Sequence, residues 1–138
     1  MPSREEAAIL ADHGERYRSR DAAIAREVEQ AVFGTALGAN GYTTLAQAER
    51  LAGKLALTPG ARVLDIGCGC GWPGLYLAEH RGARLVGSDL PFEGLARAVG
   101  NAARGGLAES SHWVQASARA LPFRHGAFDA VIHADVLC

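Results

Sequence analysis

The chain has 138 residues, a length that fits one domain with its own hydrophobic core. Hydrophobic residues make up 49% and charged residues 21%, which are ordinary values for a globular domain. Lysine and arginine (14) nearly balance aspartate and glutamate (15), and no basic run stands out, so a nucleic-acid-binding groove has no support from composition.

The absence of targeting and spanning segments, together with the cysteines, predicts a cytoplasmic protein. No stretch of about 20 apolar residues is present, so we expect no membrane association, and the charged N-terminus lacks the apolar core of a signal peptide. Cys68 and Cys70 lie inside a glycine-rich segment and not in a disulfide framework, which indicates a reducing compartment. No histidine or cysteine cluster with zinc spacing accompanies them, so we expect no metal site.

The first 57 residues are predicted to form a helical cap, or lid, ahead of the main domain. One stretch predicts an amphipathic helix, because apolar residues recur at helical spacing opposite a polar face. The apolar positions are Ile24, Val28, Ala31 and Val32, and the polar ones are Arg26, Glu27, Glu29 and Gln30. Clustered glycines at residues 34–41 predict a turn. Thr44 and Gln47 have the spacing of a capping box, which predicts a helix that ends at the TPG sequence of residues 58–60.

From residue 58 the pattern changes to short apolar strands that alternate with helices. Strands are predicted at 61–66, 83–89, 111–117 and 128–135, and helices at 74–80 and 92–104. The buried side of the second helix is expected to carry Phe92, Leu95, Ala96 and Val99. This alternation predicts βαβ units. The fold class is therefore α/β, with residues 58–138 forming a Rossmann-like, doubly wound parallel sheet covered on both faces.

Residues 63–74, VLDIGCGCGWPG, contain glycines in two overlapping patterns. Counted from Gly67 they give G-x-G-x-G, typical of S-adenosylmethionine (SAM) sites, and from Gly69 they give the G-x-G-x-x-G of dinucleotide sites. Both sites need glycines, because the backbone turns sharply after a strand and a ligand approaches it without obstruction by a Cβ. Asp89 follows about twenty residues later, where either cofactor places an acid on its ribose, so it does not decide between them.

Asp65, two residues before Gly67, favours SAM. A carboxylate that reaches the mouth of the turn would repel a pyrophosphate, whereas it would attract the ammonium and sulfonium groups of SAM. The alternative role for Asp65 is to accept hydrogen bonds from loop amides. A second feature is the tract ALPFRHGAFDAVIHADVLC at residues 120–138, which has no role in a dinucleotide fingerprint.

Three segments, VLDIGCGCG, VGSDL and ALPFRHGAFDAVIHADVL, resemble the successive motifs of the class I SAM-dependent methyltransferases. They occur in that family's order and spacing over residues 58–138. The resemblance is closest to the small-molecule branch, which includes the ubiquinone/menaquinone-type and the phosphoethanolamine- or sarcosine-type enzymes. It implies SAM as the cofactor and a small molecule as the methyl acceptor.

The resemblance also implies roles for particular residues. Asp65 and the glycine loop would surround the methionine part of SAM, Asp89 would bind the ribose, and Leu90 would lie against the adenine. Family members usually have an aspartate at the position of Ser117, so a weaker adenine contact is expected here. The cofactor-binding residues implied in this way are Tyr42, Asp65, Gly67, Cys68, Gly69, Gly71, Asp89, Leu90, Ser117, Ala118 and Ala134. Tyr17 and Asp135 are the candidates for a catalytic role on the acceptor side.

The family's sheet usually has seven strands, whereas this sequence reaches Cys138 just after the fourth. We therefore expect the N-terminal portion of a methyltransferase that binds SAM, with much of the surface that positions the acceptor lying elsewhere. A SAM-binding module without catalysis and a nicotinamide-binding oxidoreductase fragment are the alternatives. The apolar fourth strand would form an exposed edge, which predicts a homo-oligomer.

Overall fold

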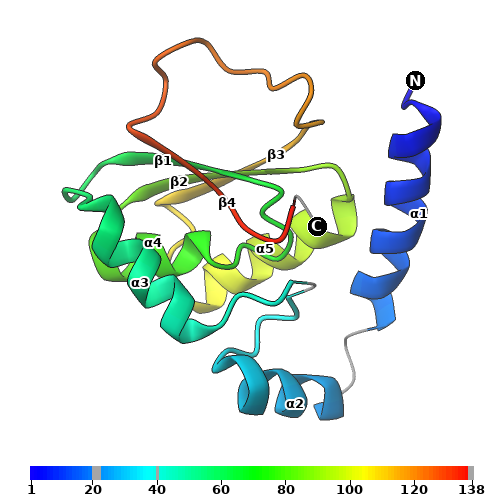
Figure 1. Ribbon diagram of the computed structural model, residues 1–138, viewed down its shortest axis with the longest axis horizontal. Helices are drawn as coiled ribbons and strands as arrows, with labels where there is room; N and C mark the ends of the chain where they lie inside the picture. The colour runs from blue at the N-terminus through cyan, green and yellow to red at the C-terminus, as the bar shows by residue number, and fades with distance from the viewer. Residues whose placement is uncertain (20–22, 40, 137–138) are drawn as a thin grey trace.

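A computed structural model describes residues 1–19, 23–39 and 41–136 of the chain. Leu137 and Cys138 lie outside the described residues. Three helices come first, and four strands then alternate with two further helices (Figure 1). In chain order the elements are α1 (Arg4–Ser19), α2 (Ala23–Phe33), α3 (Leu45–Leu55), β1 (Arg62–Ile66), α4 (Gly74–Arg81), β2 (Arg84–Asp89), α5 (Phe92–Arg104), β3 (Ser111–Gln115) and β4 (Ala130–His133).

The four strands form one parallel sheet in the order β3-β2-β1-β4, which confirms the predicted α/β class. In the register, Asp65 of β1 lies opposite Gly87 of β2 and Ile132 of β4. The chain order reverses beside β1, because β2 and β3 lie on one side of it and β4 on the other. Open parallel sheets bind ligands at such a point, outside the carboxyl ends of the strands.

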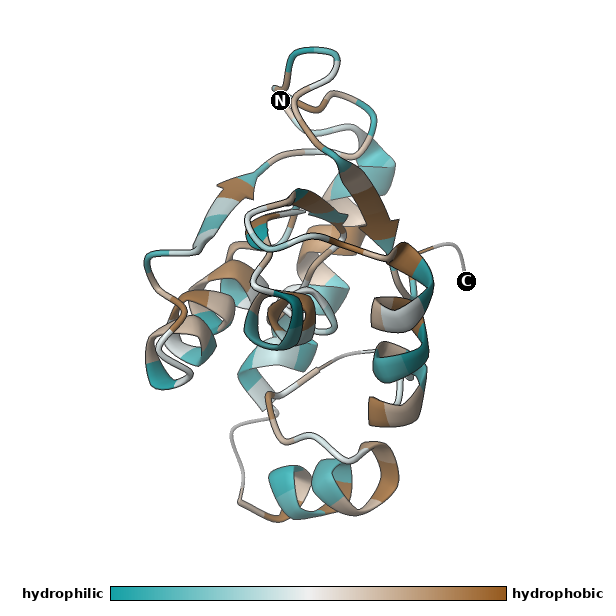
Figure 2. Ribbon diagram, turned by 90° about the vertical axis from the view of Figure 1, so that its left-hand side faces the viewer, coloured by the Kyte–Doolittle hydropathy of each residue, from teal (hydrophilic) through white to brown (hydrophobic). Residues whose placement is uncertain are grey.

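Helices α3, α4 and α5 lie together on one side of the sheet, and the segment at residues 116–129 arches on the other side (Figure 1). The core lies between the sheet and these helices, and Val63, Leu85 and Leu77 are fully buried there. Figure 2 shows the molecule from the side, with hydrophobic stretches, coloured brown, in both strands and helices. No helix among the described residues is long and apolar enough to cross a membrane.

Helix α3 begins as predicted and ends slightly earlier. The Thr44 side chain accepts a hydrogen bond from the backbone of Gln47, and the Gln47 side chain accepts one from the backbone of Thr44, so the capping box is confirmed. The helix ends at Leu55, and Ala56 follows in the left-handed conformation, before the TPG sequence is reached. Ala48 and Ala52 are the buried residues on the inner face of α3.

The predicted buried side of α5 is wrong. Leu95 is buried, but Phe92 is 64% exposed and Val99 is 53% exposed. Apart from Leu95, the inner face consists of small or polar residues: Gly94, Ala98, Asn101 and Ala102. These residues let the helix approach its neighbours closely, since a Cβ at Gly94 would lie 2.9 Å from the ring of Tyr17. The larger apolar residues are therefore turned outward.

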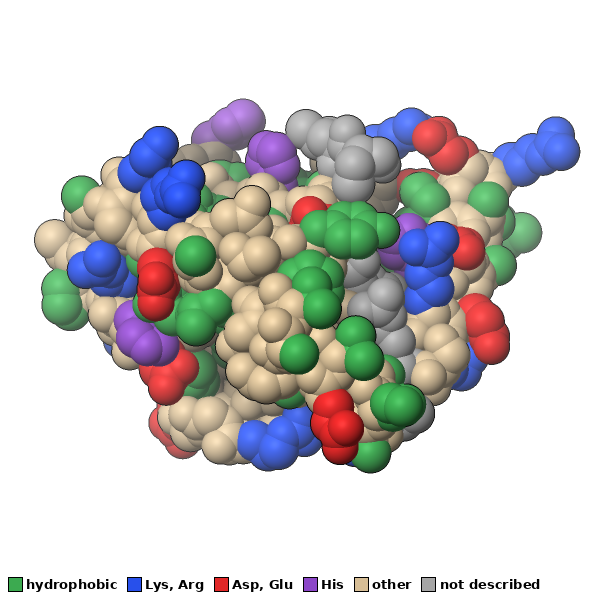
Figure 3. Space-filling model, turned by 60° about the horizontal axis from the view of Figure 1, so that its bottom comes forward, with side chains coloured by type: hydrophobic (Ala, Val, Ile, Leu, Met, Phe, Trp, Pro, Cys, Tyr) green, Lys and Arg blue, Asp and Glu red, His purple; other side chains and the backbone are tan. Residues whose placement is uncertain are grey.

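Helix α2 forms as predicted, but its apolar stripe faces outward. Ile24, Val28 and Val32 are 70%, 57% and 60% exposed, and Figure 3 shows hydrophobic side chains on the lower face where α2 lies. Glu29, expected on the polar outer face, is buried. Its carboxylate accepts hydrogen bonds from the backbone N–H groups of residues 37–39, at 2.8–3.2 Å. Buried amides need an acceptor, and this need orients the helix against its hydrophobic pattern.

Candidate functional site

A cavity of about 830 Å³ lies at the carboxyl ends of the strands, beneath α1. Figure 1 shows α1 standing beyond this edge of the sheet. The wall combines the glycine loop after β1, the end of β2, and the segments that follow β3 and β4. It brings together most of the residues predicted from the sequence: Tyr17, Tyr42, Gly67, Cys68, Gly69, Asp89, Leu90, Ser117, Ala118, Ala134 and Asp135. Asp65 and Gly71 are not part of this wall.

The glycine loop is folded back over the end of β2. The backbone N–H groups of Gly67 and Cys68 both donate to the carbonyl oxygen of Ser88, at 2.7 and 3.1 Å. Gly67 and Gly69 have φ angles of 69° and 50°, in the left-handed region that favours glycine. A Cβ at Gly67 would overlap Val136, and a Cβ at Gly69 would overlap the Tyr17 hydroxyl. The glycines therefore let Val136 and Tyr17 pack directly against the loop backbone at the cavity wall.

Asp89 joins the end of β2 to this loop. Its Oδ2 accepts a hydrogen bond from Gly69 N at 2.6 Å, and its Oδ1 accepts one from Leu90 N at 2.7 Å. Burial raises the pKa of Asp89 above its ordinary value, while these two hydrogen bonds and the nearby His13 act in the opposite direction. A carboxylate that is fixed in this way presents its remaining lone pairs to the cavity, where they are suited to accept hydroxyl groups.

Asp65 lies under the loop and not at the mouth of the turn, so its expected position is wrong. The side chain is fully buried, and it accepts a hydrogen bond from the backbone of Gly74 at the start of α4. This contact is the alternative role considered for it above. Burial raises the pKa of Asp65 well above its ordinary value, and the charge of Asp89 raises it further. Its Oδ2 has no hydrogen-bond partner among the described residues.

The two loop cysteines are unsuited to nucleophilic or metal chemistry. Both thiols are buried. Burial raises the pKa of Cys68 above its ordinary value, and it raises the pKa of Cys70 to about 12. A thiol rather than a thiolate is present at neutral pH, and the thiolate is the reactive form. Among the described residues, no three His, Cys, Asp or Glu side chains are placed to hold a metal ion.

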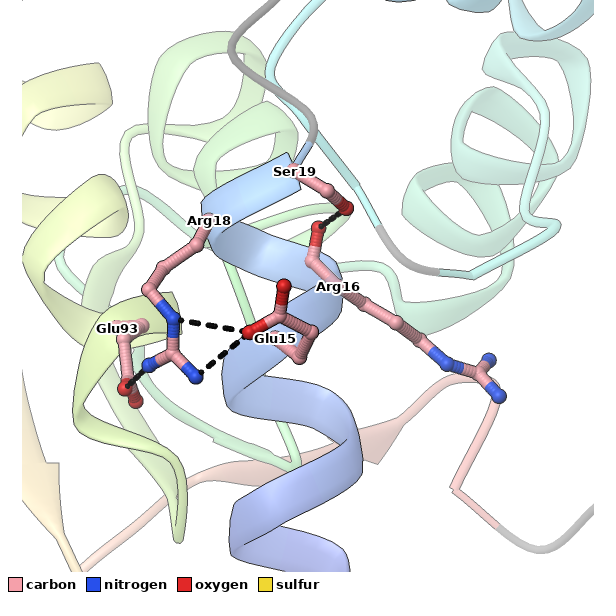
Figure 4. A network of polar contacts seen from close by, with 5 residues as sticks. All are labelled: Glu15, Arg16, Arg18, Ser19 and Glu93. Atoms are coloured by element: carbon pink, nitrogen blue, oxygen red, sulfur yellow. Dashed lines mark hydrogen bonds and ion pairs between the residues drawn. The ribbon is translucent and has the colours of Figure 1, made fainter.

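Helix α1 covers the cavity and is anchored at both ends by polar contacts. Figure 4 shows Arg18 in contact with Glu93 of α5 and, at 3.1 Å, with Glu15. Near the other end, Arg119 forms an ion pair with Glu5 at 2.7 Å. Such exposed pairs contribute little stability individually. Together with the packing of the buried Tyr17, they orient α1, and this orientation determines which of its side chains face the cavity.

Tyr17 was a candidate for the acceptor side of the site. It lies instead against the glycine loop, close to Asp89. The ring is 4% exposed and packs with Ala39 and Cys70. Burial raises the pKa of its hydroxyl, so the phenol stays protonated at neutral pH. Helix α1 also contributes residues to the wall that were not predicted from the sequence: Glu5, Glu6, Ile9, His13 and Arg16. Their spacing relative to Tyr17 places them on one helix face, a signal that was present in the sequence.

Asp135, the other candidate for a catalytic role, contacts the predicted lid. Its Oδ2 accepts hydrogen bonds from Thr43 N at 3.2 Å and from Thr43 Oγ1 at 2.8 Å. The Trp72 indole N–H donates to the Thr43 carbonyl oxygen at 2.8 Å. Thr43 is therefore held between the end of β4 and the glycine loop, and the preceding Tyr42 contributes to the cavity wall.

An open parallel sheet that carries a glycine loop and a fixed carboxylate at neighbouring strand ends is characteristic of nucleoside-binding α/β domains. Residues 63–138, more than half of the chain, match a family model described as a methyltransferase domain. The chain belongs to this family, and its fold is that of the class I methyltransferases, as the motif resemblance implied.

Individual relatives agree with this assignment. Botryococcene C-methyltransferase of Botryococcus braunii is 38% identical over 89 residues, which are 64% of this chain and 24% of that protein. Sterol 24-C-methyltransferase ERG6B of Gibberella zeae is 35% identical over 81 residues, 59% of this chain and 21% of that protein. A SAM-dependent methyltransferase from Thiobacillus denitrificans, crystallised with S-adenosylhomocysteine, has a TM-score of 0.60 at 27% identity and covers 65% of this chain. The chain spans 36% of that structure.

Proposed function

We propose that this chain binds SAM in the cavity beneath α1 and supplies the cofactor-binding part of a methyltransferase. The observation that carries the proposal is Asp89, whose carboxylate is fixed by Gly69 N and Leu90 N beside the glycine loop. A ribose with two hydroxyls matches this carboxylate. The Thiobacillus structure was obtained with S-adenosylhomocysteine, which supports the same assignment for this chain.

The cavity residues fit the parts of SAM in order along the strand ends. Asp89 would accept the ribose hydroxyls, and Leu90 with Ala118 would enclose the adenine. The glycine loop, whose Gly67 and Gly69 border the cavity, would receive the methionine part. SAM supplies an electrophilic methyl group on a sulfonium. The contribution of the chain is to bind and orient it, since such a transfer depends mainly on positioning.

Asp135 and Tyr17 are positioning residues in this proposal. Asp135 holds Thr43, and with it the segment that carries Tyr42, at the cavity wall. Tyr17 fills the space between α1 and the loop. The acceptor is a small molecule, and isoprenoid compounds are the first class to test, because two relatives are named for botryococcene and sterol substrates.

Calorimetric titration of the chain with SAM, S-adenosylhomocysteine and NAD tests the cofactor assignment, and tighter binding of NAD would refute it. Incubation with radiolabelled SAM and a panel of isoprenoids, amines, phenols and thiols tests the transfer. Binding with label incorporation supports an enzyme. Binding without incorporation supports a SAM-binding module that needs further protein surface for catalysis.

A further inference from the structure

The first turn of α1 places the carboxylate of Glu6 in the wall of the cavity beneath this helix. Leu90 and Ala118, which would enclose the adenine in the function proposed above, belong to the same wall. The Glu6 carboxylate accepts a hydrogen bond from the side chain of Ser117, the residue before Ala118. An acid from the N-terminal helix therefore borders the proposed adenine end of the cavity, and the cofactor binding described so far gives it no role.

A capping box holds Glu6 at this place. Ser3 N donates a hydrogen bond to Glu6 Oε2 at 2.8 Å, and Glu6 N donates one to Ser3 Oγ at 3.2 Å. The contact with Ser117 connects this first turn of α1 to the segment that follows β3. The hydrogen bonds from Ser117 and Ser3 lower the pKa of Glu6 below its ordinary value, so its carboxylate is ionised at neutral pH.

Two other oxygens on residues of this part of the wall already accept hydrogen bonds. The Leu90 carbonyl oxygen accepts one from Gln115 Nε2 at 2.8 Å. Ser117 Oγ accepts one from Arg119 N at 3.3 Å and uses its own proton for Glu6. An ionised carboxylate has about four lone-pair sites, and the side-chain hydrogen bonds described above use two of them. Glu6 therefore combines spare acceptor capacity with a full negative charge.

We propose that Glu6 accepts a hydrogen bond from the 6-amino group of the cofactor adenine and selects adenine over purines that lack this donor. The inference rests on the cofactor binding proposed above. An amino group that leaves water on binding needs an acceptor, and an ionised acceptor forms a stronger hydrogen bond than a neutral one. The weaker adenine contact expected from the neutral Ser117 is offset in this way by a carboxylate from a different element of the fold.

Calorimetric titration of the full chain with two ligands tests this role. One ligand is S-adenosylhomocysteine, and the other is its analogue in which a hydrogen atom replaces the 6-amino group. We expect the wild type to bind S-adenosylhomocysteine about tenfold more tightly than the analogue, the effect of one hydrogen bond to a charged acceptor. Glu6→Ala should weaken binding of S-adenosylhomocysteine by about the same factor and leave the affinity for the analogue nearly unchanged, so that the ratio of affinities falls to about one.

Three further variants separate hydrogen bonding to adenine from the orientation of α1. Glu6→Gln keeps the capping box and a neutral acceptor, so its ratio should lie between those of the wild type and Glu6→Ala. Ser3→Ala removes one hydrogen bond of the capping box and keeps the Glu6 carboxylate. Glu5→Gln breaks the neighbouring ion pair with Arg119. In both of these controls any change in affinity should be the same for the two ligands, and the ratio should stay that of the wild type.

Circular dichroism confirms that each variant is folded. Equal affinity of the wild type for the two ligands, an unchanged ratio in folded Glu6→Ala, or an equal fall of the ratio in Ser3→Ala would overturn the role of Glu6 and leave the cofactor assignment in place. Failure of the wild type to bind either ligand would instead refute the proposed function, and this inference with it.

Discussion

Replacing Asp89 with alanine removes the carboxylate that we assign to the cofactor ribose. In the chain itself, the N–H groups of Gly69 and Leu90 lose the Asp89 carboxylate oxygens that accept their hydrogen bonds at 2.6 and 2.7 Å. These amides border the cavity, so water can replace part of the lost bonding. The removal of a buried acid with a raised pKa offsets the remaining cost. We therefore expect Asp89→Ala to fold and to keep its glycine loop.

Asp89→Ala should reduce the free energy of cofactor binding by more than it reduces the free energy of unfolding. A hydrogen bond from a ribose hydroxyl to a charged acceptor contributes about 1.5–3 kcal/mol. Losing that net contribution weakens binding of S-adenosylhomocysteine by about 10- to 150-fold. Asp89→Asn should lie between the wild type and Asp89→Ala, because it keeps one acceptor oxygen. Binding to the wild type should also weaken on acidification at a higher pH than for an ordinary aspartate, since burial raises the pKa of Asp89.

Calorimetric titration with S-adenosylhomocysteine measures these differences, and circular dichroism confirms that each variant is folded. Glu49→Ala provides the control, because Glu49 is an exposed acid on α3, outside the cavity wall. If folded Asp89→Ala bound the ligand as tightly as the wild type, Asp89 would not hold the ribose. The assignment of the cavity would then be wrong.

The remaining predictions concern stability and assembly. Burial raises the pKa of Asp65 in the folded state above its unfolded value of about 3.9. Between these two pKa values the folded chain holds a proton that the unfolded chain has lost, so the free energy of unfolding falls as the pH rises. Asp65→Asn should remove this slope in urea unfolding from pH 4 to 7.5, and a pH-independent difference from the wild type would contradict the reasoning. Tyr17→Ala should lower the free energy of unfolding by about 3–5 kcal/mol, as for other buried aromatics, and Tyr17→Phe by much less. We propose that the outer edge of β4, where Val131 is 55% exposed, pairs with a second copy of the chain. Light scattering should then show an oligomer for the wild type and a shift to monomer for Val131→Lys. A monomeric wild type would refute this proposal.

The α/β class was accessible from the sequence because it depends on local signals, and the residues of the site were accessible because their motifs resemble those of a known family. Short apolar runs that alternate with helices predict parallel βαβ units. The motif spacing placed Gly67, Gly69 and Asp89 at neighbouring strand ends, and the structure brings them together in one wall. The capping box of α3 was similarly local, since Thr44 and Gln47 need only each other.

The orientation of the helices was not accessible in this way. On α2 and α5 the larger apolar residues face outward, because the inner faces are determined by partners outside the helix itself. The amides of residues 37–39 require the Glu29 carboxylate, and close packing against Tyr17 requires Gly94. The hydrophobic pattern of a helix depends only on its own side chains. It contains no information on buried polar groups of other segments that need a hydrogen-bond partner from that helix.

Polar contacts from other elements hold the glycine loop in one conformation, together with the packing of its buried Cys70 side chain. Asn101 donates to the carbonyl oxygens of both Cys70 and Leu37, at 2.9 Å each. Asp89 and the Ser88 carbonyl hold the other side of the loop. Glycines make the loop accessible, but they also make it costly to order. The neighbouring elements meet this cost before any ligand arrives, so a cofactor that binds here meets a backbone already in place. Since Leu37 belongs to the segment that follows α2, the N-terminal helices take part in this ordering as well as in covering the cavity.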